Sequence, residues 1–250
     1  MKKLALLLAA SLFVVAFLAG CPAEVPDDVV DIPETETYSA ASNADRRGYV
    51  EIEIDVTDGD IVNVRIDEYD GFGFLKDYET YAGGGELWPY LEESHEQLAE
   101  WIVQDNHWDV DTFTEATGTS EKVRSAARHA MIRAGLEDPV DTDYFDGTFM
   151  GVSEPDDRDQ FGVAWVTFDN DEIVEVALEE ATPDNDGYAF KDEDYAADTD
   201  YTEFHEAQEV MPERFIEAQG PDVDVYTEAT GSSEKWMEAV ENAMEKARVN

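Results

Sequence analysis

The segment DTFTEATGTSEK, Asp111 to Lys122, returns 113 residues later as DVYTEATGSSEK, Asp224 to Lys235, with nine of twelve positions identical. Each copy precedes a helical pattern in which small and apolar residues share one face, at the same offset in both. On that face lie Val123, Ala126, Ala127, Ala130, Met131 and Ala134 after the first copy, and Trp236, Ala239, Val240, Ala243, Met244 and Ala247 after the second. A period of this length exceeds the roughly 20–50 residues of solenoid repeats. The sequence therefore predicts two tandem copies of one domain.

Each predicted domain opens with a strand, a turn and a returning strand. In the first domain, apolar and acidic residues alternate from Val50 to Val56, which is typical of a half-buried strand, and TDGD supplies the turn. In the second domain, the strand Phe161–Phe168 is rich in aromatic and β-branched residues, and DND supplies the turn.

A helix is also expected in the second part of each domain, near residues 94–105 and 204–218, and Pro212 is expected to kink or split the later one. The predicted fold class is α+β, an antiparallel sheet packed with helices, in residues 47–137 and again in residues 143–250.

The first twenty residues have the pattern of a lipoprotein signal peptide. A basic start, MKK, precedes the apolar run Leu4–Leu18, which ends in LAG and Cys21. This run is too short for a transmembrane helix, which needs about 20 apolar residues. Cys21 is the single cysteine and the expected acceptor of a diacylglyceryl group, so we expect a lipid-anchored protein on the extracytoplasmic face of the cell membrane. The Pro-containing, acidic residues 21–46 are expected to be a flexible tether.

Acidic residues dominate the composition, with 61 Asp and Glu against 16 Lys and Arg and a formal net charge of −45. Such a surface repels nucleic acid, so no nucleic-acid partner is expected. The hydrophobic content of 43% is enough for real cores and argues against global disorder. We attribute the charge to a salty medium, in which salt screens the self-repulsion. One cysteine excludes an internal disulfide, and no cluster of His, Cys and acids has transition-metal spacing.

The repeated segment has the chemistry of a helix start. Its candidate N-cap residues are Thr119, Ser120, Ser232 and Ser233. A duplicated domain duplicates its caps, so helix capping alone is one interpretation of the repeat. A cap, however, does not require Asp111, Thr114, Ala116 and Thr117 as well. A helix N-terminus is also a ready site for a phosphate, and a threonine hydroxyl there is well placed to carry a phosphodiester.

The segments DTFTEAT and DVYTEAT are similar to the flavinylation motif D-x-x-[ST]-G-A-T of FMN-binding domains. Such domains occur in the covalent-flavin subunits of the sodium-pumping NADH:quinone reductase and a related ion pump. They also occur as tandem pairs in lipid-anchored flavoproteins of extracellular electron transfer. In that family, a flavin transferase moves FMN from FAD to the last threonine of the motif. The resemblance extends over about residues 47–136 and 144–247.

This resemblance implies two covalent FMN groups, joined through their phosphates to Thr117 and Thr230. Asp111 and Asp224 are implied to be motif residues that the transferase needs. The other implied cofactor-binding residues are Thr114, Thr227, Ala116, Ala229, Ser120 and Ser233. The motif's glycine is replaced by Glu115 and Glu228. A carboxylate there mildly repels a phosphodiester, and glycine is favoured where the backbone needs unusual freedom.

Aromatic residues between the hairpin and the helix of each domain are candidate walls for an isoalloxazine ring, although most are expected in the core. They are Tyr69, Phe72, Phe74, Tyr78, Tyr81 and Trp88 in the first domain, and Tyr188, Phe190, Tyr195, Tyr201 and Phe204 in the second. His95 and His205 are expected at the surface, with a proton partner for reduced flavin as the alternative. Thr182–Glu193 partly matches a calcium loop, but an acidic turn is expected.

The function expected from this resemblance is that of a membrane-anchored electron carrier rather than an enzyme with its own substrate. Its partners would be a flavin transferase, a quinol- or NADH-linked membrane donor and an extracellular acceptor. Two alternatives remain open at this point: a binding or structural lipoprotein of the same fold without flavin, and a flavin-dependent extracellular reductase.

Overall fold

The computed structural model describes residues 34–250 apart from 84–85, 186, 192–194 and 196–201. The predicted signal peptide, Cys21 and most of the predicted tether lie outside the described residues. Residues Pro33–Asn250 form one compact unit. None of the helices in the described part of the chain has the length and apolar character needed to cross a membrane.

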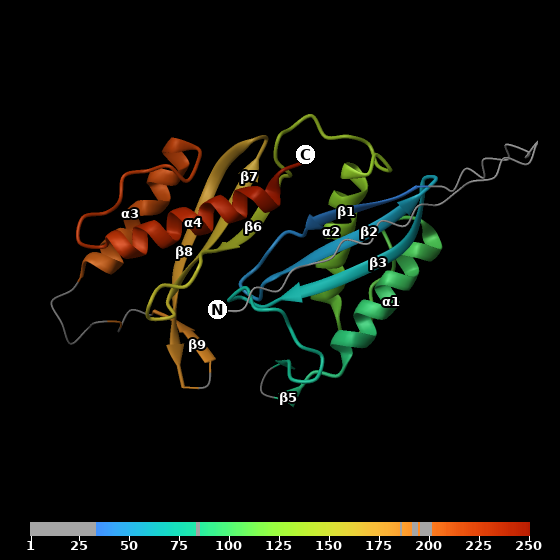
Figure 1. Cartoon of the computed structure of the whole chain (residues 1–250), viewed down its shortest axis with the longest axis horizontal. Coiled ribbons are helices and arrows are strands. Elements are labelled where there is room, and N and C mark those ends of the chain that lie inside the picture. The colour runs from blue at the N-terminus through green and yellow to red at the C-terminus, as the bar shows by residue number, and fades with distance from the viewer. Residues whose placement is uncertain (1–33, 84–85, 186, 192–194, 196–201) are drawn as a thin grey trace, which may run out of the picture. The chain divides into compact units, whose positions relative to one another are not determined.

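The first half of this unit has three long strands and two helices (Figure 1). Antiparallel strands form a sheet in the order β1-β2-β3, and a two-stranded pair, β4-β5, precedes the first helix. The elements are β1 (Thr35–Ala41), β2 (Tyr49–Thr57), β3 (Asp60–Tyr69), β4 (Ala82–Gly83), β5 (Glu86–Leu87), α1 (Tyr90–Asp105) and α2 (Thr117–Arg133).

The second half repeats this order of long elements. Its antiparallel sheet has the order β6-β7-β8-β9, and two helices follow. The elements are β6 (Gly147–Val152), β7 (Phe161–Asp169), β8 (Glu172–Asp184), β9 (Gly187–Phe190), α3 (Glu203–Ala218) and α4 (Thr230–Ala247). The α+β class and the helices after both copies of the repeated segment are confirmed.

Local details of the two halves also correspond. The central strands carry an irregularity at Asp55/Val56 and at Thr167/Phe168, an offset of 112 residues. Both α1 and α3 end in a left-handed C-cap residue whose side-chain carbonyl accepts a backbone N–H from the sheet. Asn106 accepts from Ile61 at 2.8 Å, and Gln219 accepts from Ile173 at 2.7 Å. The repeat therefore extends from the strands through the helix ends.

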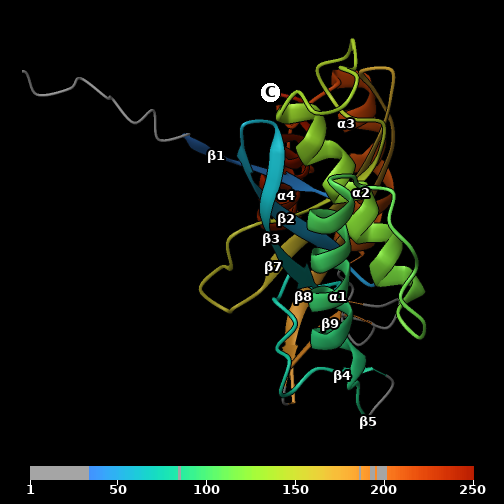
Figure 2. The same ribbon diagram turned by 90° about the vertical axis from the view of Figure 1, so that its right-hand side faces the viewer.

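The helices of the first half cover one face of its sheet. Both α1 and α2 lie on that face (Figure 2), and Val50, Ile52 and Ile54 are fully buried there. The opposite face carries acids of β2, and Arg65 pairs with Glu53 and Asp55 at 2.8 Å each. This one-sided burial is the physical reason for the alternating pattern of β2.

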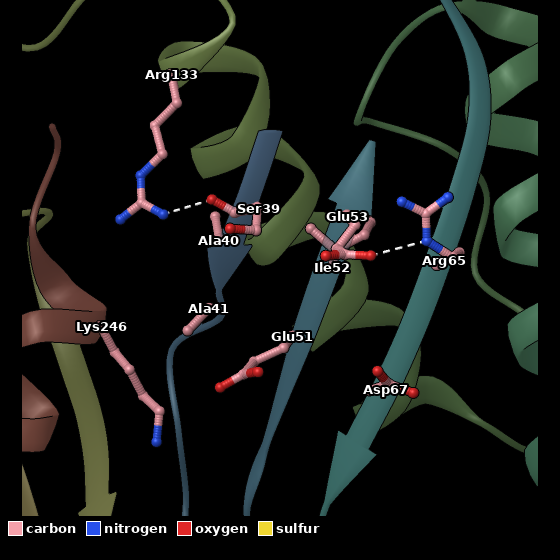
Figure 3. Close-up of a pocket in the computed structure, with 10 residues that line it drawn as sticks. All are labelled: Ser39, Ala40, Ala41, Glu51, Ile52, Glu53, Arg65, Asp67, Arg133 and Lys246. Atoms are coloured by element: carbon pink, nitrogen blue, oxygen red, sulfur yellow. Dashed lines mark hydrogen bonds and ion pairs between the residues drawn. The ribbon is translucent and has the colours of Figure 1, made fainter. Parts of the chain in front are cut away.

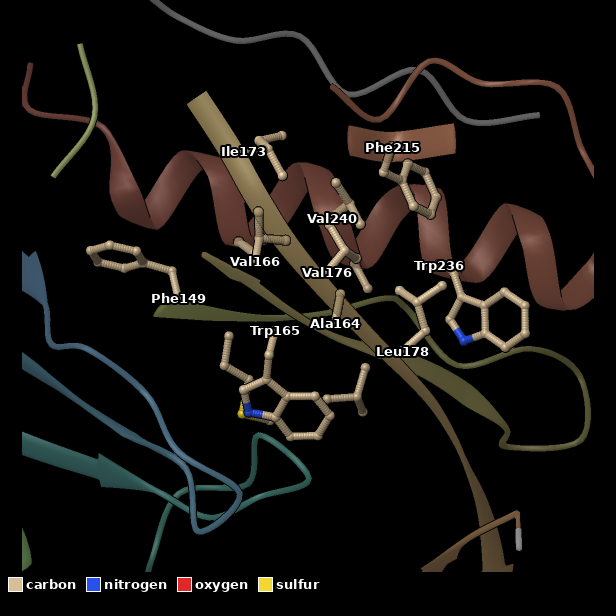
Figure 4. Close-up of a cluster of buried hydrophobic side chains, with 14 of the residues drawn as sticks. Phe149, Ala164, Trp165, Val166, Ile173, Val176, Leu178, Phe215, Trp236 and Val240 are labelled. Carbon is tan, nitrogen blue, oxygen red and sulfur yellow. The ribbon is translucent and has the colours of Figure 1, made fainter. Parts of the chain in front are cut away.

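Strand β7, in contrast, is buried on both faces, which explains its continuous apolar sequence. One face packs under α4. Figure 4 shows Trp165 pointing away from α4, on the other side of the strands from Trp236 and Val240. The indole N–H of Trp165 donates to the Asp45 carbonyl at 3.1 Å, and the Arg46 guanidinium lies 4.1 Å from its ring centre. The second face of β7 is therefore covered by the first half.

Aromatic residues continue this contact between the halves. The ring of Phe72 lies 4.5 Å from that of Phe190, and His129 stacks on Phe145 at 4.0 Å. Four of the residues predicted as candidate flavin walls instead join the halves: Phe72, Phe74, Tyr188 and Phe190.

Two sequence-based expectations are corrected here. The tether was expected to reach residue 46, but Thr35–Ala41 forms β1 and pairs with β2. This strand was missed because it is polar and mostly exposed; its fixed contacts include Thr37, which donates to Asp55 at 2.6 Å. The expectation that Pro212 could split its helix is also wrong, because α3 runs unbroken from Glu203 to Ala218.

Candidate functional site

The two threonines of the repeated segment occupy the same structural position. Thr117 is the first residue of α2 and Thr230 is the first residue of α4, and both are exposed. The preceding N-cap residues are alanines, so neither N-cap residue makes a side-chain hydrogen bond to its helix start. The first backbone N–H groups of a helix have no intrahelical acceptor, and they carry the positive end of the helix dipole. Each threonine hydroxyl therefore lies at an uncapped, electropositive helix start.

The expected N-caps, Thr119, Ser120, Ser232 and Ser233, are wrong, because both helices begin earlier than predicted. The Ser120 hydroxyl instead donates to the Ala116 carbonyl at 2.9 Å and accepts the Phe113 N–H at 3.0 Å. Ser233 makes the equivalent bonds to Ala229 and Tyr226 at 2.9 and 3.0 Å. These serines hold the loop that carries the rest of the motif against its helix.

The glutamates that replace the motif's glycine both have a left-handed backbone. The φ angle is 74° at Glu115 and 69° at Glu228. Side chains with a Cβ are strained in this region, whereas glycine is not. The backbone therefore gives a physical reason for glycine at this position.

The remaining motif residues lie in the loop before the helix. Asp111, Asp224, Thr114 and Thr227 are exposed to solvent, whereas Ala116 and Ala229 are buried. None of the four exposed side chains lines the cavities described next. They are accessible to another protein rather than directed at a pocket.

A cavity of about 300 Å³ adjoins Thr117. It is lined by residues of three kinds, which come from separate parts of the first half. The basic and acidic ones are Arg47, Lys76, Lys122, Asp45, Glu68 and Glu115; the aromatic ones are Tyr81 and Trp88; and the helix start supplies Ala116, Thr117, Gly118 and Thr119.

Glu68 is the buried acid of this cavity, with 3% of its surface exposed. Its Oε1 lies 2.6 Å from Lys76 Nζ, and its Oε2 accepts the Thr119 hydroxyl at 3.0 Å and contacts His95 Nε2 at 3.2 Å. Burial raises the pKa of Glu68, but the hydrogen bond from His95 and the hydrogen bond and charge of Lys76 outweigh this effect and hold the pKa at about 2. Glu68 is therefore ionised and fixes both lysine and histidine.

The cations of the cavity are held in place by acids and aromatic rings. Lys122 pairs with Asp45 at 2.8 Å, and Lys76 Nζ lies 4.6 Å from the ring centre of Tyr81. Both lysines are buried. Since they are ordered and partly desolvated, their charges act strongly on any anion that enters the cavity.

The second half has a corresponding cavity of about 540 Å³ beside Thr230. Lys235 pairs with Glu180 at 2.8 Å and with Asp156 at 3.0 Å. Lys191 also pairs with Glu180 and lies 4.3 Å from the ring centre of Tyr195. Burial raises the pKa of Glu180, but hydrogen bonds from the two lysines leave the pKa below its ordinary value. Arg158, Phe204, Glu228, Ala229, Gly231 and Ser232 complete the lining.

The two cavities therefore share the same arrangement of charged and aromatic residues. Glu68, Lys76 and Lys122 correspond to Glu180, Lys191 and Lys235, and in each half an aspartate holds the helix lysine while an aromatic ring lies under the other lysine. With Arg47 and Arg158, these cavities hold six of the 16 Lys and Arg residues in the sequence. In so acidic a chain, this is a local concentration of cations, and each of the four lysines is paired with an acid.

These charged residues are not among those predicted from the sequence, although the repeated segment contains two of them. Lys122 and Lys235 end the repeated segment at identical positions, whereas Lys76 and Glu68 lie far from it in the chain. Of the predicted aromatic walls, Tyr81, Trp88, Tyr195 and Phe204 do line the cavities. Tyr69 stacks on Tyr49 instead, and Tyr201 lies outside the described residues.

The two histidines differ from expectation. His95 is buried, with 4% of its surface exposed, so its expected place on the surface is wrong. His205 is half-buried, and its Nε2 lies 3.2 Å from the Tyr195 carbonyl. The calcium-loop candidate falls in β8, β9 and the residues around them, and the described part of the chain contains no group of acids, His and Cys suited to a metal.

A third cavity, of about 270 Å³, contains Arg133 and Lys246 (Figure 3). Arg133 donates to the carbonyls of Ser39, Arg248 and Val249, which ties α2 to β1 and to the C-terminal residues. Lys246 donates to the Met150 carbonyl at 3.2 Å, and burial lowers its pKa to about 8 against the opposing charge of Glu51. These contacts give Arg133 and Lys246 a structural role.

The match to a protein family lies in the first half. Residues 46–132 match the model of the FMN-binding domain family. No curated protein matches the chain. Among solved structures, the chain is similar to the CPE2226 protein from Clostridium perfringens, with 21% sequence identity and a TM-score of 0.34 over 42% of this chain and 90% of that one.

The matched region contains Thr117 and most of the residues that line its cavity, including Arg47, Glu68, Lys76 and Lys122. Residues 46–132 are therefore similar to FMN-binding domains, and FMN is the cofactor that this match supports.

Proposed function

We propose that this protein is a lipid-anchored, extracytoplasmic electron carrier with FMN bound covalently to Thr117 and Thr230, one in each of two tandem domains. One observation carries the proposal. An exposed threonine begins a helix beside a cavity lined by lysines, acids and aromatic rings, and this arrangement occurs twice in the chain. The match of residues 46–132 to the FMN-binding domain family supports FMN as the cofactor.

The residues at the first site fit a flavin mononucleotide. A phosphate joined to the Thr117 hydroxyl would face the free N–H groups of the α2 start, an arrangement that favours an anion. A Cβ atom added to Gly118 would have no neighbouring atom within 4 Å. The start of α2 is therefore open to a bulky group. Lys76 and Lys122 would balance the added negative charge, and Tyr81 and Trp88 offer aromatic faces to a planar ring.

The bound FMN would supply reversible electron uptake. The residues of the chain would hold the FMN in place and would provide charged side chains around it. The helix start orients the phosphate, and Glu68 and Glu180 keep the cavity lysines in place. A covalent bond also keeps the cofactor on a protein that faces the outside of the cell. We infer anchoring through lipid on Cys21, maturation by a flavin transferase, reduction by a quinol- or NADH-linked membrane donor, and oxidation by an extracellular acceptor.

A second candidate function rests on Glu115 and Glu228. These residues add strain and negative charge where the resembling motif has glycine. This observation favours a binding or structural lipoprotein of the same fold that holds no covalent flavin.

Intact mass and visible absorbance separate the two candidates. We expect protein produced with a flavin transferase to carry two FMN adducts, and Thr117→Ala and Thr230→Ala to lose one each. Thr119→Ala is the matched control, because its hydroxyl is buried on Glu68 and is expected to remain unmodified. Peptide mapping assigns the adducts. A colourless protein of unmodified mass would overturn the carrier proposal and favour the binding lipoprotein.

A further inference from the structure

A buried chain of polar groups leads from the surface to the first cavity. The Tyr78 hydroxyl lies 3.1 Å from His95 Nδ1, and His95 Nε2 lies 3.2 Å from Glu68 Oε2. An ionised carboxylate only accepts hydrogen bonds, so Nε2 carries a hydrogen and, in the neutral ring, Nδ1 accepts from Tyr78. Nδ1 is therefore the atom of His95 that can take up a proton.

His95 lies between two cavities. Glu68 lines the cavity at Thr117, whereas Tyr78, Asp67, Glu96 and His95 itself line another of about 330 Å³. Tyr78 is 43% exposed, while 5% of the His95 side chain is exposed. A proton from solvent can therefore reach Nδ1 of His95 from the Tyr78 side. The positive charge that His95 then carries lies next to Glu68, which lines the cavity at Thr117.

The charged groups around His95 come from each element packed against it. Strand β3 supplies Glu68, Asp67 and Arg65, the last of which is paired with Glu53 and Asp55. The following loop supplies Lys76 and Tyr78, and α1 itself supplies Glu92 and Glu96. Helix α2 contributes the neutral Thr119 hydroxyl through Glu68. Burial and these acids raise the pKa of Tyr78, so it remains a neutral hydroxyl that can donate to Nδ1 or accept from it.

The second half lacks this proton acceptor. The residue of α3 that corresponds to His95 is Gln208, since α1 begins at Tyr90 and α3 begins at Glu203. Gln208 donates through Nε2 to the Leu178 carbonyl at 2.8 Å and to Glu179 at 3.1 Å. An amide does not titrate, so at this corresponding position the first half has an ionisable group and the second half has none.

We propose that His95 takes up one proton at Nδ1 when the first site is reduced, and that the second site, with Gln208, has no such coupled proton. This inference rests on the proposed function. The membrane donor supplies the electron pair, and solvent supplies the proton that becomes bound to Nδ1. The resulting imidazolium keeps its Nε2–H bond to Glu68 and donates its new Nδ1–H to the Tyr78 oxygen. Its positive charge offsets part of the negative charge added beside Lys76.

Single-site proteins test the proposal through their midpoint potentials between pH 5 and 8, the range in which histidine titrates. Thr230→Ala keeps only the first site, and Thr117→Ala keeps only the second. One additional proton per electron pair changes the equilibrium tenfold per pH unit, or about 30 mV for a two-electron couple. We expect the first-site potential to fall more steeply with rising pH than the second-site potential, with a difference approaching this value.

His95→Gln in the Thr230→Ala protein reproduces the residue of the second half. We expect it to remove the additional slope, because the glutamine retains polarity but cannot bind the proton. The matched control is His107→Gln, which changes a histidine of the same half whose side chain is 48% exposed and which faces Glu137. This control should leave the slope unchanged. Equal slopes at the two sites, or an unchanged slope in His95→Gln, would overturn the inference.

A direct measurement of His95 needs no substitution of that residue. In the Thr230→Ala protein at fixed pH, ¹⁵N NMR should show His95 Nδ1 changing from an imine to a protonated nitrogen on reduction. No change in this signal would count against the inference alone. Absence of flavin from both threonines would remove both the proposed function and the inference, so the two failures are distinguishable.

Discussion

Arg46 and Glu179 form an ion pair of 3.1 Å that joins the two halves beside their cavities. The neighbours of Arg46 in the chain, Asp45 and Arg47, line the cavity at Thr117. The neighbour of Glu179, Glu180, lines the cavity at Thr230. The loop at residues 45–47, beside the cavity at Thr117, is therefore attached to strand β8, which contributes to the cavity at Thr230.

The first prediction concerns this attachment. Arg46→Ala should lower the free energy of unfolding by about 1 kcal/mol, and most of this loss should come from the contact with the Trp165 ring. The Arg46 side chain is 58% exposed, so its ion pair with Glu179 adds little. Arg46→Lys should lower the free energy of unfolding by most of the same amount, since an ammonium group cannot stack on the ring as a planar guanidinium does. Urea unfolding at constant salt measures both.

Arg158→Ala is the control for the loss of a positive charge. Its side chain is 74% exposed and its guanidinium lies 3.7 Å from Asp156, without an aromatic ring below it in the described residues. A loss of stability in Arg158→Ala equal to that in Arg46→Ala would show that net charge, rather than the contact between the halves, causes the effect.

The second prediction concerns the left-handed glutamates. Glu115→Gly should raise the free energy of unfolding by about 1 kcal/mol, because a residue with a Cβ is strained at a φ of 74° and glycine is not. Under the proposed function, it should also increase the fraction of Thr117 modified by a transferase. Thermal unfolding and intact mass measure the two effects.

Glu115→Ala separates backbone strain from charge. It removes the carboxylate but keeps the Cβ, so it should leave the strain in place. If alanine stabilises the protein as much as glycine does, the charge of Glu115 and not its backbone is responsible, and the explanation from φ fails. Glu228→Gly and Glu228→Ala repeat the comparison at a φ of 69°.

The sequence predicted the parts of the fold that depend on neighbouring residues. The alternation in β2 and the small-residue face of α2 are local patterns, and both elements form. The burial of His95 was not predictable in this way, because its partner Glu68 is 27 residues earlier and is brought to it by the packing of α1 on β3. The lysines of the cavities were missed for the same reason.

Strand β1 shows another limit of local patterns. Its residues are mostly exposed, and the strand is defined by pairing with β2, from Thr35 opposite Thr57 to Ala41 opposite Glu51. Such a polar edge strand has no hydrophobic period to reveal it.

The third prediction concerns salt. With a formal net charge of −45, the folded chain repels itself, and added KCl should raise its thermal unfolding midpoint. The Debye length falls from about 10 Å at 0.1 M to about 3 Å at 1 M, so most of the gain should come below 1 M. Sucrose at equal osmolality is the uncharged control. A similar gain in sucrose would show that general solute exclusion, rather than screening, causes the effect.

The fourth prediction concerns His129, which lies at the contact between the halves. Its ring stacks on Phe145, and its Nδ1 donates to the Ala41 carbonyl at 2.8 Å. Burial lowers its pKa to about 4, helped by the charges of Arg128 and Arg133 and opposed by the bond to Ala41. Since histidine in the unfolded chain titrates near 6.5, the unfolded state binds more protons between pH 6.5 and 4, and stability falls as the pH falls through this window.

From pH 7 to pH 5, this histidine should reduce the free energy of unfolding by about 2 kcal/mol. Glu68 and Asp156, with pKa values of about 2, lose their contributions at lower pH and do not account for a change in this window. His129→Gln should therefore flatten the pH dependence of urea unfolding between pH 7 and 5, whereas the exposed-site control His107→Gln should not. An equally steep dependence in His129→Gln would assign the acid sensitivity to another group.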